Sequence, residues 1–317
     1  MSMRAFALDE FGAPGSIHHL PIPEPGAGEL LIDVQAAAVN VMDPLYVAGV
    51  LKDYMEHRFP LVPGIDFAGV VKAVGPDVDG FAAGDEVYGV SSKPFVGAGT
   101  FAEFAVVPAD GTAPKPESID FAAAASVPHV GLTALAAVEA ADPQPGQKVV
   151  VVGATGGVGS FVTQLAAARG AMVVAVTAGA GAAQAREFGA AETIDYQADN
   201  VAAALRDRFP EGVDIVISTH GDVDVVAGVA AALRPGGTVV SPAMRADAAK
   251  AALEPMGLVF RGVNRLPAVR LPELTALIEG GQLHVPPIQT YPLELATEAI
   301  SAMGAGHVRG KLVITIP

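Results

Sequence analysis

A glycine-rich segment is the first feature of this chain that could do chemistry. Residues 153–159 read Gly-Ala-Thr-Gly-Gly-Val-Gly and follow the apolar run 149–152, which is typical of a strand buried on both faces of a parallel sheet. Apolar residues at helical spacing come next, from Val158 to Leu165. Glycines let the backbone approach a pyrophosphate closely, and the first N–H groups of a helix bind anions. The order strand, turn, helix predicts a dinucleotide site, although a tight turn without a ligand would use the same glycines. Its candidate contacts are Gly153, Ala154, Thr155, Gly156, Gly157 and Val158.

The end of the second predicted strand bears on which dinucleotide would bind. NAD sites usually place an acid there to bind the ribose hydroxyls. Here the strand 172–176 continues as Thr177-Ala178-Gly179-Ala180-Gly181, without an acid. A carboxylate would repel a 2′-phosphate, so its absence permits NADPH and leaves NADH as the alternative. Thr177 and Ala178 are added to the candidate contacts. Arg186 is the nearest basic residue, and it could equally be a solvated residue on the face of a helix.

The elements that must hold this loop alternate between strands and helices. Apolar strands are predicted at 149–152, 172–176, 213–217 and 237–240, and helical stretches at 182–188, 200–209 and 223–233. This alternation predicts a doubly wound α/β sheet over residues 118–280. Residues 1–117 combine short apolar runs with Gly and Pro turns, which indicates a β unit, and the closing strand 311–316 resembles that unit. We therefore predict a sheet domain, 118–280, inserted into a β domain formed by 1–117 and 281–317.

Composition limits the classes of function. The chain has 317 residues, enough for about two domains. Its net charge of −15 disfavours nucleic acid as the main partner. With no cysteine, the chain forms neither disulfides nor thiolate zinc sites. We see no apolar run of roughly 18 residues and no signal peptide, so we expect a cytoplasmic enzyme without a membrane segment, acting on a small molecule.

Several motifs in order resemble the zinc-free quinone oxidoreductase group of the medium-chain dehydrogenase/reductase superfamily. They lie at 36–43, 63–71, 81–89, 99–104, 131–134, 153–159 and 306–311, so the resemblance covers nearly the whole chain. It implies a Rossmann domain inserted into a GroES-like β-barrel domain, with NADPH bound and a quinone or an activated C=C bond as hydride acceptor. It also implies a homodimer. A non-catalytic NADPH-binding protein, crystallin-like or redox-sensing, is the alternative that some relatives represent.

The resemblance also predicts that no metal takes part. The Cys-His-Ser-Asp of zinc-dependent relatives looks like Asn40-Val41-Met42-Asp43 here, and their Gly-His-Glu looks like Gly64-Ile65-Asp66. A catalytic zinc needs about three protein ligands. Because Asn and Ile fill two ligand positions, we expect hydride transfer without a metal.

Single residues take roles from the same resemblance. Asn40 would lie near the nicotinamide and Tyr46 would face the substrate; together they could stabilise an oxyanion, with Tyr46 or solvent as the proton donor. Asn40 as a turn residue and Tyr46 as a packing aromatic are the structural alternatives. The resemblance adds the cofactor candidates Thr133, Tyr196, Arg309 and Lys311. Thr219 and His220 are candidates because they lie just past the carboxyl end of a predicted strand, at a segment that departs from the family pattern. Many NADPH-using relatives have a lysine where this chain has Gly181, which leaves the NADPH preference open.

Overall fold

The computed structural model describes residues 1–244 and 246–317, and they form two compact units. The first unit comprises Met1–His129, Pro267–Gly280 and Pro287–Pro317, and the second comprises Val130–Leu266 and Gly281–Pro286. The chain leaves the first unit and returns to it, but at other residues than the predicted 117/118 and 280/281.

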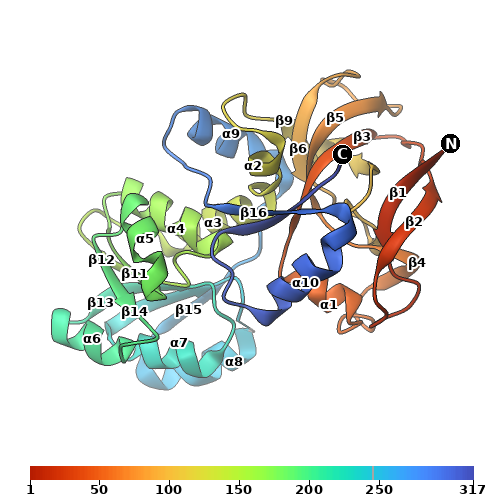
Figure 1. Cartoon of the computed structure of the whole chain (residues 1–317). Helices are drawn as coiled ribbons and strands as arrows, with labels where there is room; N and C mark the ends of the chain where they lie inside the picture. The colour runs from red at the N-terminus through yellow and green to blue at the C-terminus, as the bar shows by residue number, and fades with distance from the viewer. Residues whose placement is uncertain (245) are drawn as a thin grey trace. The chain divides into compact units, whose positions relative to one another are not determined.

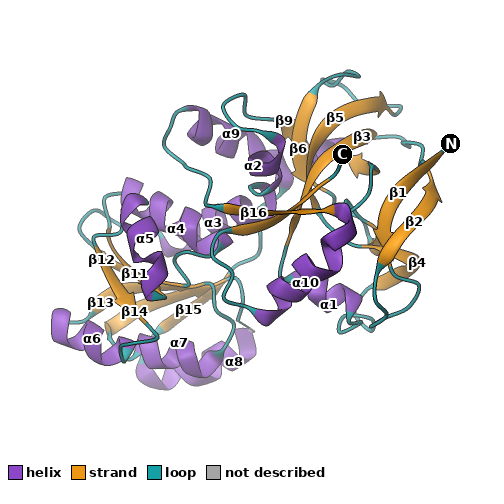
Figure 2. Ribbon diagram, viewed as in Figure 1, coloured by secondary structure: helices purple, strands orange, loops and turns teal. Residues whose placement is uncertain are grey.

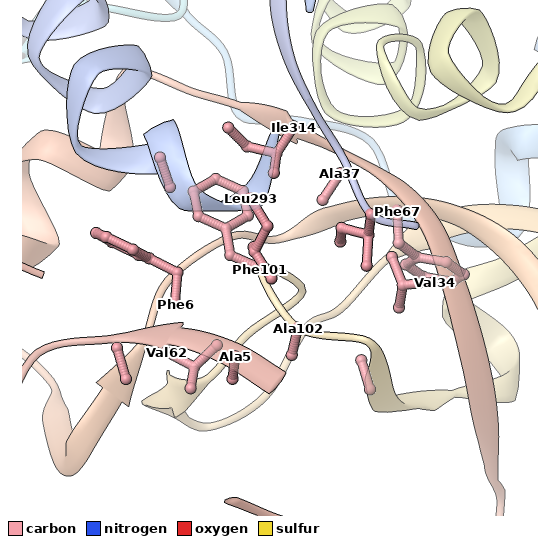
Figure 3. Close-up of a cluster of buried hydrophobic side chains, with 14 of the residues drawn as sticks. Ala5, Phe6, Val34, Ala37, Val62, Phe67, Phe101, Ala102, Leu293 and Ile314 are labelled. Carbon is pink, nitrogen blue, oxygen red and sulfur yellow. The ribbon is translucent and has the colours of Figure 1, made fainter. Parts of the chain in front are cut away.

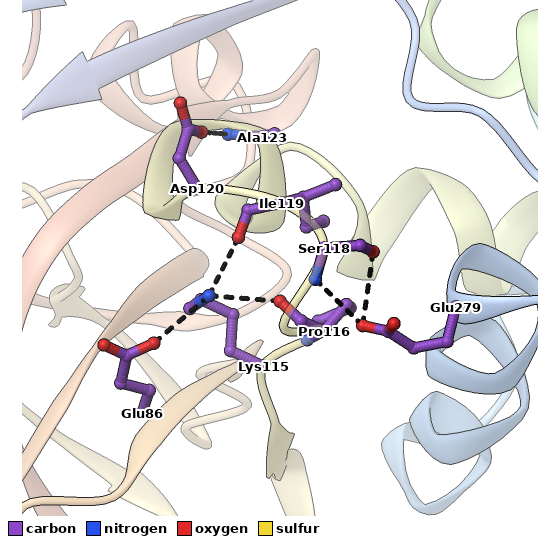
Figure 4. Close-up of polar contacts among 8 residues, drawn as sticks. All are labelled: Glu86, Lys115, Pro116, Ser118, Ile119, Asp120, Ala123 and Glu279. Carbon is purple, nitrogen blue, oxygen red and sulfur yellow. Dashed lines mark hydrogen bonds and ion pairs between the residues drawn. The ribbon is translucent and has the colours of Figure 1, made fainter. Parts of the chain in front are cut away.

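Polar contacts explain why residues 118–129 and 267–280 belong to the first unit. The Lys115 ammonium lies 3.1 Å from the Glu86 carboxylate and donates a hydrogen bond to the Ile119 carbonyl at 2.8 Å (Figure 4). Ser118 N–H and Oγ both donate to Glu279 Oε1, at 3.1 and 3.2 Å. These bonds fasten the segment after 117 and the helix that ends at 279 to the same unit.

Two further contacts show how the chain changes unit after Leu266. The buried Tyr88 hydroxyl donates to the carbonyl of Leu271 at 3.1 Å, which holds 267–280 in the first unit. His284 exchanges two bonds with the Gln164 side chain, at 2.7 and 2.9 Å, which holds 281–286 in the second. Such contacts between distant residues leave no local pattern in the sequence.

The first unit is built on a seven-stranded sheet. The strands, in sheet order, are β16 (Ile288–Pro292), β17 (Lys311–Thr315), β3 (Glu29–Val39), β5 (Asp66–Val74), β6 (Glu86–Val90) and β9 (Thr112–Pro114), and β8 (Phe104–Pro108) also pairs with β3. Two smaller sheets pair β1 (Ser2–Ala7) with β2 (Ser16–Pro21) and β4 (Glu56–Val62) with β7 (Phe95–Ala98). The helices are α1 (Met42–Val47), α2 (Phe121–Ala125), α9 (Leu271–Glu279) and α10 (Ala296–Ala305). β17 runs antiparallel to β3 with Leu312 opposite Val39, so the last strand of the chain completes the first unit's main sheet.

The core of the first unit joins residues from both ends of the chain. Phe6, Phe67, Phe101, Leu293 and Ile314 are at most 2% exposed and lie in one cluster (Figure 3). Burying a side chain of this size stabilises a fold by roughly 1.5–3 kcal/mol. The cluster therefore ties the segment after Pro287 firmly to the N-terminal strands.

The second unit is a six-stranded parallel sheet. Its strands, in sheet order, are β12 (Glu192–Asp195), β11 (Met172–Thr177), β10 (Lys148–Val152), β13 (Val213–Ser218), β14 (Leu233–Ser241) and β15 (Val259–Gly262). The chain builds outward from β10 to β12 and then returns to place β13 beside β10. The order of strands reverses between β10 and β13, which is where ligands bind in such sheets.

Helices cover both faces of this parallel sheet (Figures 1 and 2). α4 (Gly157–Ala168) and α5 (Ala182–Glu187) lie on one face, and α6 (Val201–Arg208), α7 (Val223–Ala230) and α8 (Ala246–Leu253) lie on the other. α3 (Pro128–Ala141) precedes β10. Because both faces are covered, β10 reads as the continuous run Val149–Val152, every residue of it buried. β12 was not predicted as a strand, since its sequence Glu-Thr-Ile-Asp has one fully buried residue.

Candidate active site

The glycine loop 153–159, which we call the glycine cradle, is packed too closely for a side chain at two of its positions. Gly153 has φ +78°, a conformation that L side chains rarely adopt, and a Cβ built on it would lie 2.4 Å from Thr219 Oγ1. A Cβ on Gly159 would lie 2.1 Å from the Gly153 carbonyl oxygen. The glycines are therefore required for the helix to start this close to the loop.

The N-terminus of α4 has no side-chain cap. Its N-cap residue, Gly156, is extended and offers no side-chain oxygen to the first N–H groups of the helix. These groups and the positive end of a 12-residue helix suit an anion. The cradle and the uncapped helix together fit the pyrophosphate of a dinucleotide.

Three threonines surround the loop at the ends of neighbouring strands. Thr155 Oγ1 and Thr177 Oγ1 are 2.6 Å apart, and both residues are buried. Thr219 Oγ1 donates to the Val152 carbonyl at 3.0 Å. Thr155, Thr177 and Thr219 thus lie at the carboxyl ends of β10, β11 and β13, respectively, the edge at which ligands bind in such sheets.

The remaining candidates of the second unit are less closely tied to the loop. Tyr196 N–H donates to the Thr177 carbonyl at 3.3 Å and the side chain is 42% exposed, so this residue borders the end of β11. His220 is exposed, and its Nδ1 accepts from Asp222 N–H at 3.2 Å, which is a local turn contact. Ala178 directly follows β11, and Thr133 is buried in α3.

In the first unit, a buried ammonium joins Asn40 to the last strand. Lys311 Nζ donates to Asn40 Oδ1 at 2.7 Å and to the Val39 carbonyl at 2.8 Å. Asn40 Nδ2 donates to Asp66 Oδ2 at 3.0 Å and to the Ala38 carbonyl at 3.3 Å. Both amide hydrogens and the amide oxygen of Asn40 are therefore engaged within this unit. Lys311 faces inward, whereas Arg309, two residues earlier, is exposed.

Asp43 lies beside this network and is fully buried. Its carboxylate accepts from the N–H groups of Asn40 at 2.7 Å and Gly64 at 3.0 Å. Burial raises the pKa of Asp43 to about 7, against the lowering effect of those two N–H groups and of Lys311. Burial lowers the pKa of Lys311, and the charges of Asp66 and Asp43 oppose that shift. We call Asn40, Asp43, Asp66 and Lys311 the polar cluster.

Tyr46 lies on α1, 9% exposed, next to an aromatic group that the sequence did not identify. Burial, and secondarily the charge of Asp43, raises the pKa of its hydroxyl. Its ring meets that of His57 edge to face, with centroids 6.3 Å apart. His57 Nδ1 is 2.8 Å from the Met55 carbonyl, and its buried Nε2 has no partner among the described residues.

Comparisons with known proteins identify the family. Residues 26–117 match the family model of the alcohol dehydrogenase GroES-like domain, and residues 188–314 match that of the zinc-binding dehydrogenases. The chain is 33% identical to the chloroplastic NADPH-dependent alkenal/one oxidoreductase of Arabidopsis thaliana, over 98% of this chain and 79% of that protein. It is 29% identical to the chloroplastic quinone oxidoreductase QR1 of Triphysaria versicolor, over 98% of each. The solved structure of the quinone oxidoreductase from Coxiella burnetii superposes with a TM-score of 0.89, at 29% identity and over the whole of both chains.

The chain belongs to the quinone oxidoreductase group of the medium-chain dehydrogenase/reductase superfamily. The predicted fold class, a Rossmann sheet domain with a GroES-like domain, is confirmed. No helix among the described residues of this superfamily member is long and apolar enough to cross a membrane.

The residues at the two zinc-ligand positions of this oxidoreductase do not suit a metal. The amide of Asn40 is fully hydrogen bonded, and Ile65 offers no ligand atom. Within residues 1–244 and 246–317, no three His, Cys, Asp or Glu side chains are grouped so that they could hold an ion. The side chains of Asn40 and Ile65 are consistent with hydride transfer without a metal, which stays a prediction.

Sequence reasoning missed three residues of this oxidoreductase that the structure places at its candidate sites. Asp66 stood in a family motif but received no role, and it accepts hydrogen bonds from Asn40 and from His129 N–H at 3.0 Å. His57 gave no signal, because a single His in a sequence is usually structural. Asp195 ends β12, a strand too polar to be identified from its pattern.

Proposed function

We propose that this chain is a reductase that transfers hydride from NADPH, with NADH as the alternative, to a quinone or an activated C=C bond of a small molecule, without a metal. The glycine cradle of the second unit is the observation that carries the proposal, because Gly153 and Gly159 allow a turn too tight for side chains, which leads into the uncapped N-terminus of α4. The names of the relatives from Arabidopsis thaliana and Triphysaria versicolor support the class of substrate.

In this proposal the second unit holds the dinucleotide. The loop 153–158 and the N–H groups at the N-terminus of α4 bind its pyrophosphate, and Thr155, Thr177 and Thr219 line the same edge of the sheet. Thr133, Ala178, Tyr196, His220 and Arg309 remain proposed contacts. When bound, the dinucleotide supplies the hydride, so the protein has to orient the acceptor and stabilise the charge that develops on it.

Tyr46 is the proposed donor to that charge. Its raised pKa keeps the hydroxyl protonated at neutral pH, so that it can donate a hydrogen bond to an oxygen of the acceptor. Asn40 can stabilise that charge directly only if it exchanges one of its present hydrogen bonds for one to the acceptor. We propose that it acts mainly through the polar cluster, which fixes the ends of β3 and β17.

Steady-state oxidation of NADPH and NADH tests the function. The acceptors are 1,4-benzoquinone, 9,10-phenanthrenequinone and small enones, each assayed with and without the protein. We expect turnover with at least one class. Tight binding of the dinucleotide without turnover of any acceptor would favour the non-catalytic alternative, and absence of binding would reject both.

We also propose that the protein is a cytoplasmic homodimer. β15 is the outer strand of the parallel sheet, and Val259 on it is 44% exposed, which suits pairing with a second copy. The absence of cysteine suits a reducing compartment. Light scattering during size-exclusion chromatography would give the mass, and a monomer would contradict the dimer.

A further inference from the structure

A carboxylate stands beside the loop that follows β11, although β11 itself ends without an acid. Asp195 ends β12 and lies opposite Thr177, the last residue of β11, in the parallel register. Its Oδ1 accepts from Gln197 N–H at 2.9 Å, which fixes the side chain. A Cβ built on Gly179 would lie 2.6 Å from Asp195 Oδ2. The second carboxylate oxygen is therefore directed at the loop 178–181.

The same loop has little room for a basic side chain. A Cβ on Gly181 would lie 2.5 Å from Thr177 Oγ1 and 2.9 Å from Thr155 Oγ1, so a longer residue at 181 would require these threonines to move. Arg186, on α5, donates to Thr193 Oγ1 at 2.8 Å. Among the described residues, the charged side chain that the structure places against Gly179 is thus the carboxylate of Asp195.

In a doubly wound sheet, the adenosine ribose of a bound dinucleotide lies at the end of the second strand. In this sheet the second strand is β11. We propose that Asp195 is the residue by which this chain discriminates between NADH and NADPH, an inference that rests on the proposed function. Its Oδ2 accepts a hydrogen bond from an unphosphorylated ribose, and its charge weakens the binding of a 2′-phosphate. The acid expected at the end of the second strand is supplied instead by the third.

Fragments that carry only the adenosine end test this assignment. Isothermal titration measures the Kd of ADP-ribose and of 2′-phospho-ADP-ribose for the wild type and for Asp195→Asn, which keeps the acceptor for Gln197 N–H and removes the charge. We expect the ratio of the two Kd values to shift toward the phosphorylated fragment by about tenfold or more, as for loss of a like charge a few Å away. The ratio of the Kd values for NADH and NADPH should shift in the same direction.

Asp199→Asn is the matched control. Asp199 is exposed, lies four residues further on and carries the same charge, so its loss changes the net charge equally. We expect the control to shift the ratio by less than about twofold, because exposed charges further away are screened by salt. An unchanged ratio in Asp195→Asn, or an equal shift in Asp199→Asn, would overturn the role of Asp195. If neither fragment nor either dinucleotide binds the wild type, the proposed function itself fails.

Discussion

The ammonium of Lys311 lies 2.7 Å from the amide oxygen of Asn40, although 271 residues separate the two in the chain. Lys311 begins β17 and Asn40 follows β3, so the pairing of these strands brings the two side chains together. The ammonium is buried near two buried carboxylates, Asp43 and Asp66. The stability of the first unit should therefore depend on this single charge.

Lys311→Met should lower the free energy of unfolding by about 3–5 kcal/mol, because it leaves Asp43 and Asp66 without their buried cation. Urea denaturation followed by circular dichroism measures the change. Lys72→Met is the matched control: Lys72 is exposed on β5, and its loss should change stability by no more than about 0.5 kcal/mol. Equal stability of Lys311→Met and the wild type would show that the cluster does not need the charge.

The raised pKa of Asp43 should make stability depend on pH. The folded state binds a proton up to about pH 7, whereas the ordinary pKa is 3.8, so the folded state holds more protons between these values. The stabilisation linked to the protonated form is complete below pH 3.8 and is lost as pH rises through about 7. We therefore expect the free energy of unfolding of the wild type, relative to Asp43→Asn, to fall across this range. A titration of the carboxyl carbon by NMR gives the pKa directly, and a midpoint near 4 would contradict the prediction.

Gly159→Ala should weaken binding of the dinucleotide by about tenfold or more, since its Cβ would lie 2.1 Å from the Gly153 carbonyl oxygen and displace the loop. Gly228→Ala is the comparison. A Cβ on Gly228, inside α7, would meet nothing within 4 Å, and the change should stabilise the protein by roughly 0.5–1 kcal/mol through helix propensity. Fluorescence titration with the reduced dinucleotide measures binding, and thermal melting shows that both variants fold. Undiminished binding by Gly159→Ala would argue against the glycine cradle.

Tyr46→Phe should lower kcat by about 10²–10³-fold with a smaller change in KM, as for loss of a donor to a developing oxyanion. Because burial raises the pKa of Tyr46, the wild-type rate should decline only at strongly alkaline pH, and this decline should vanish in the variant. Tyr54→Phe removes a hydroxyl from an exposed residue of the same segment and should leave kcat unchanged. Should Tyr46→Phe turn over like the wild type, the tyrosine only packs.

The sequence allowed prediction of those parts whose cause is local. The run Val149–Val152 and the glycines after it are set by burial on two faces and by a tight turn, and both leave a pattern within ten residues. The proximity of Lys311 to Asn40 could be anticipated only from resemblance, and their mutual hydrogen bond not at all, because strand pairing at this separation has no local signal. Asp195 was not predicted as a site residue. An acid was expected at the end of the second strand, β11, whereas this acid ends the neighbouring strand, β12.

The completion of the first unit's sheet by β17 has a consequence for the order in which a growing chain can fold. The sheet of the second unit lies within residues 148–262, so it can form while the remaining residues are still being synthesised. Asp43 and Asp66 are synthesised long before Lys311. Until Lys311 leaves the ribosome, its ammonium cannot interact with their carboxylates. The first unit's main sheet can thus be completed only after the sheet of the second unit has been synthesised.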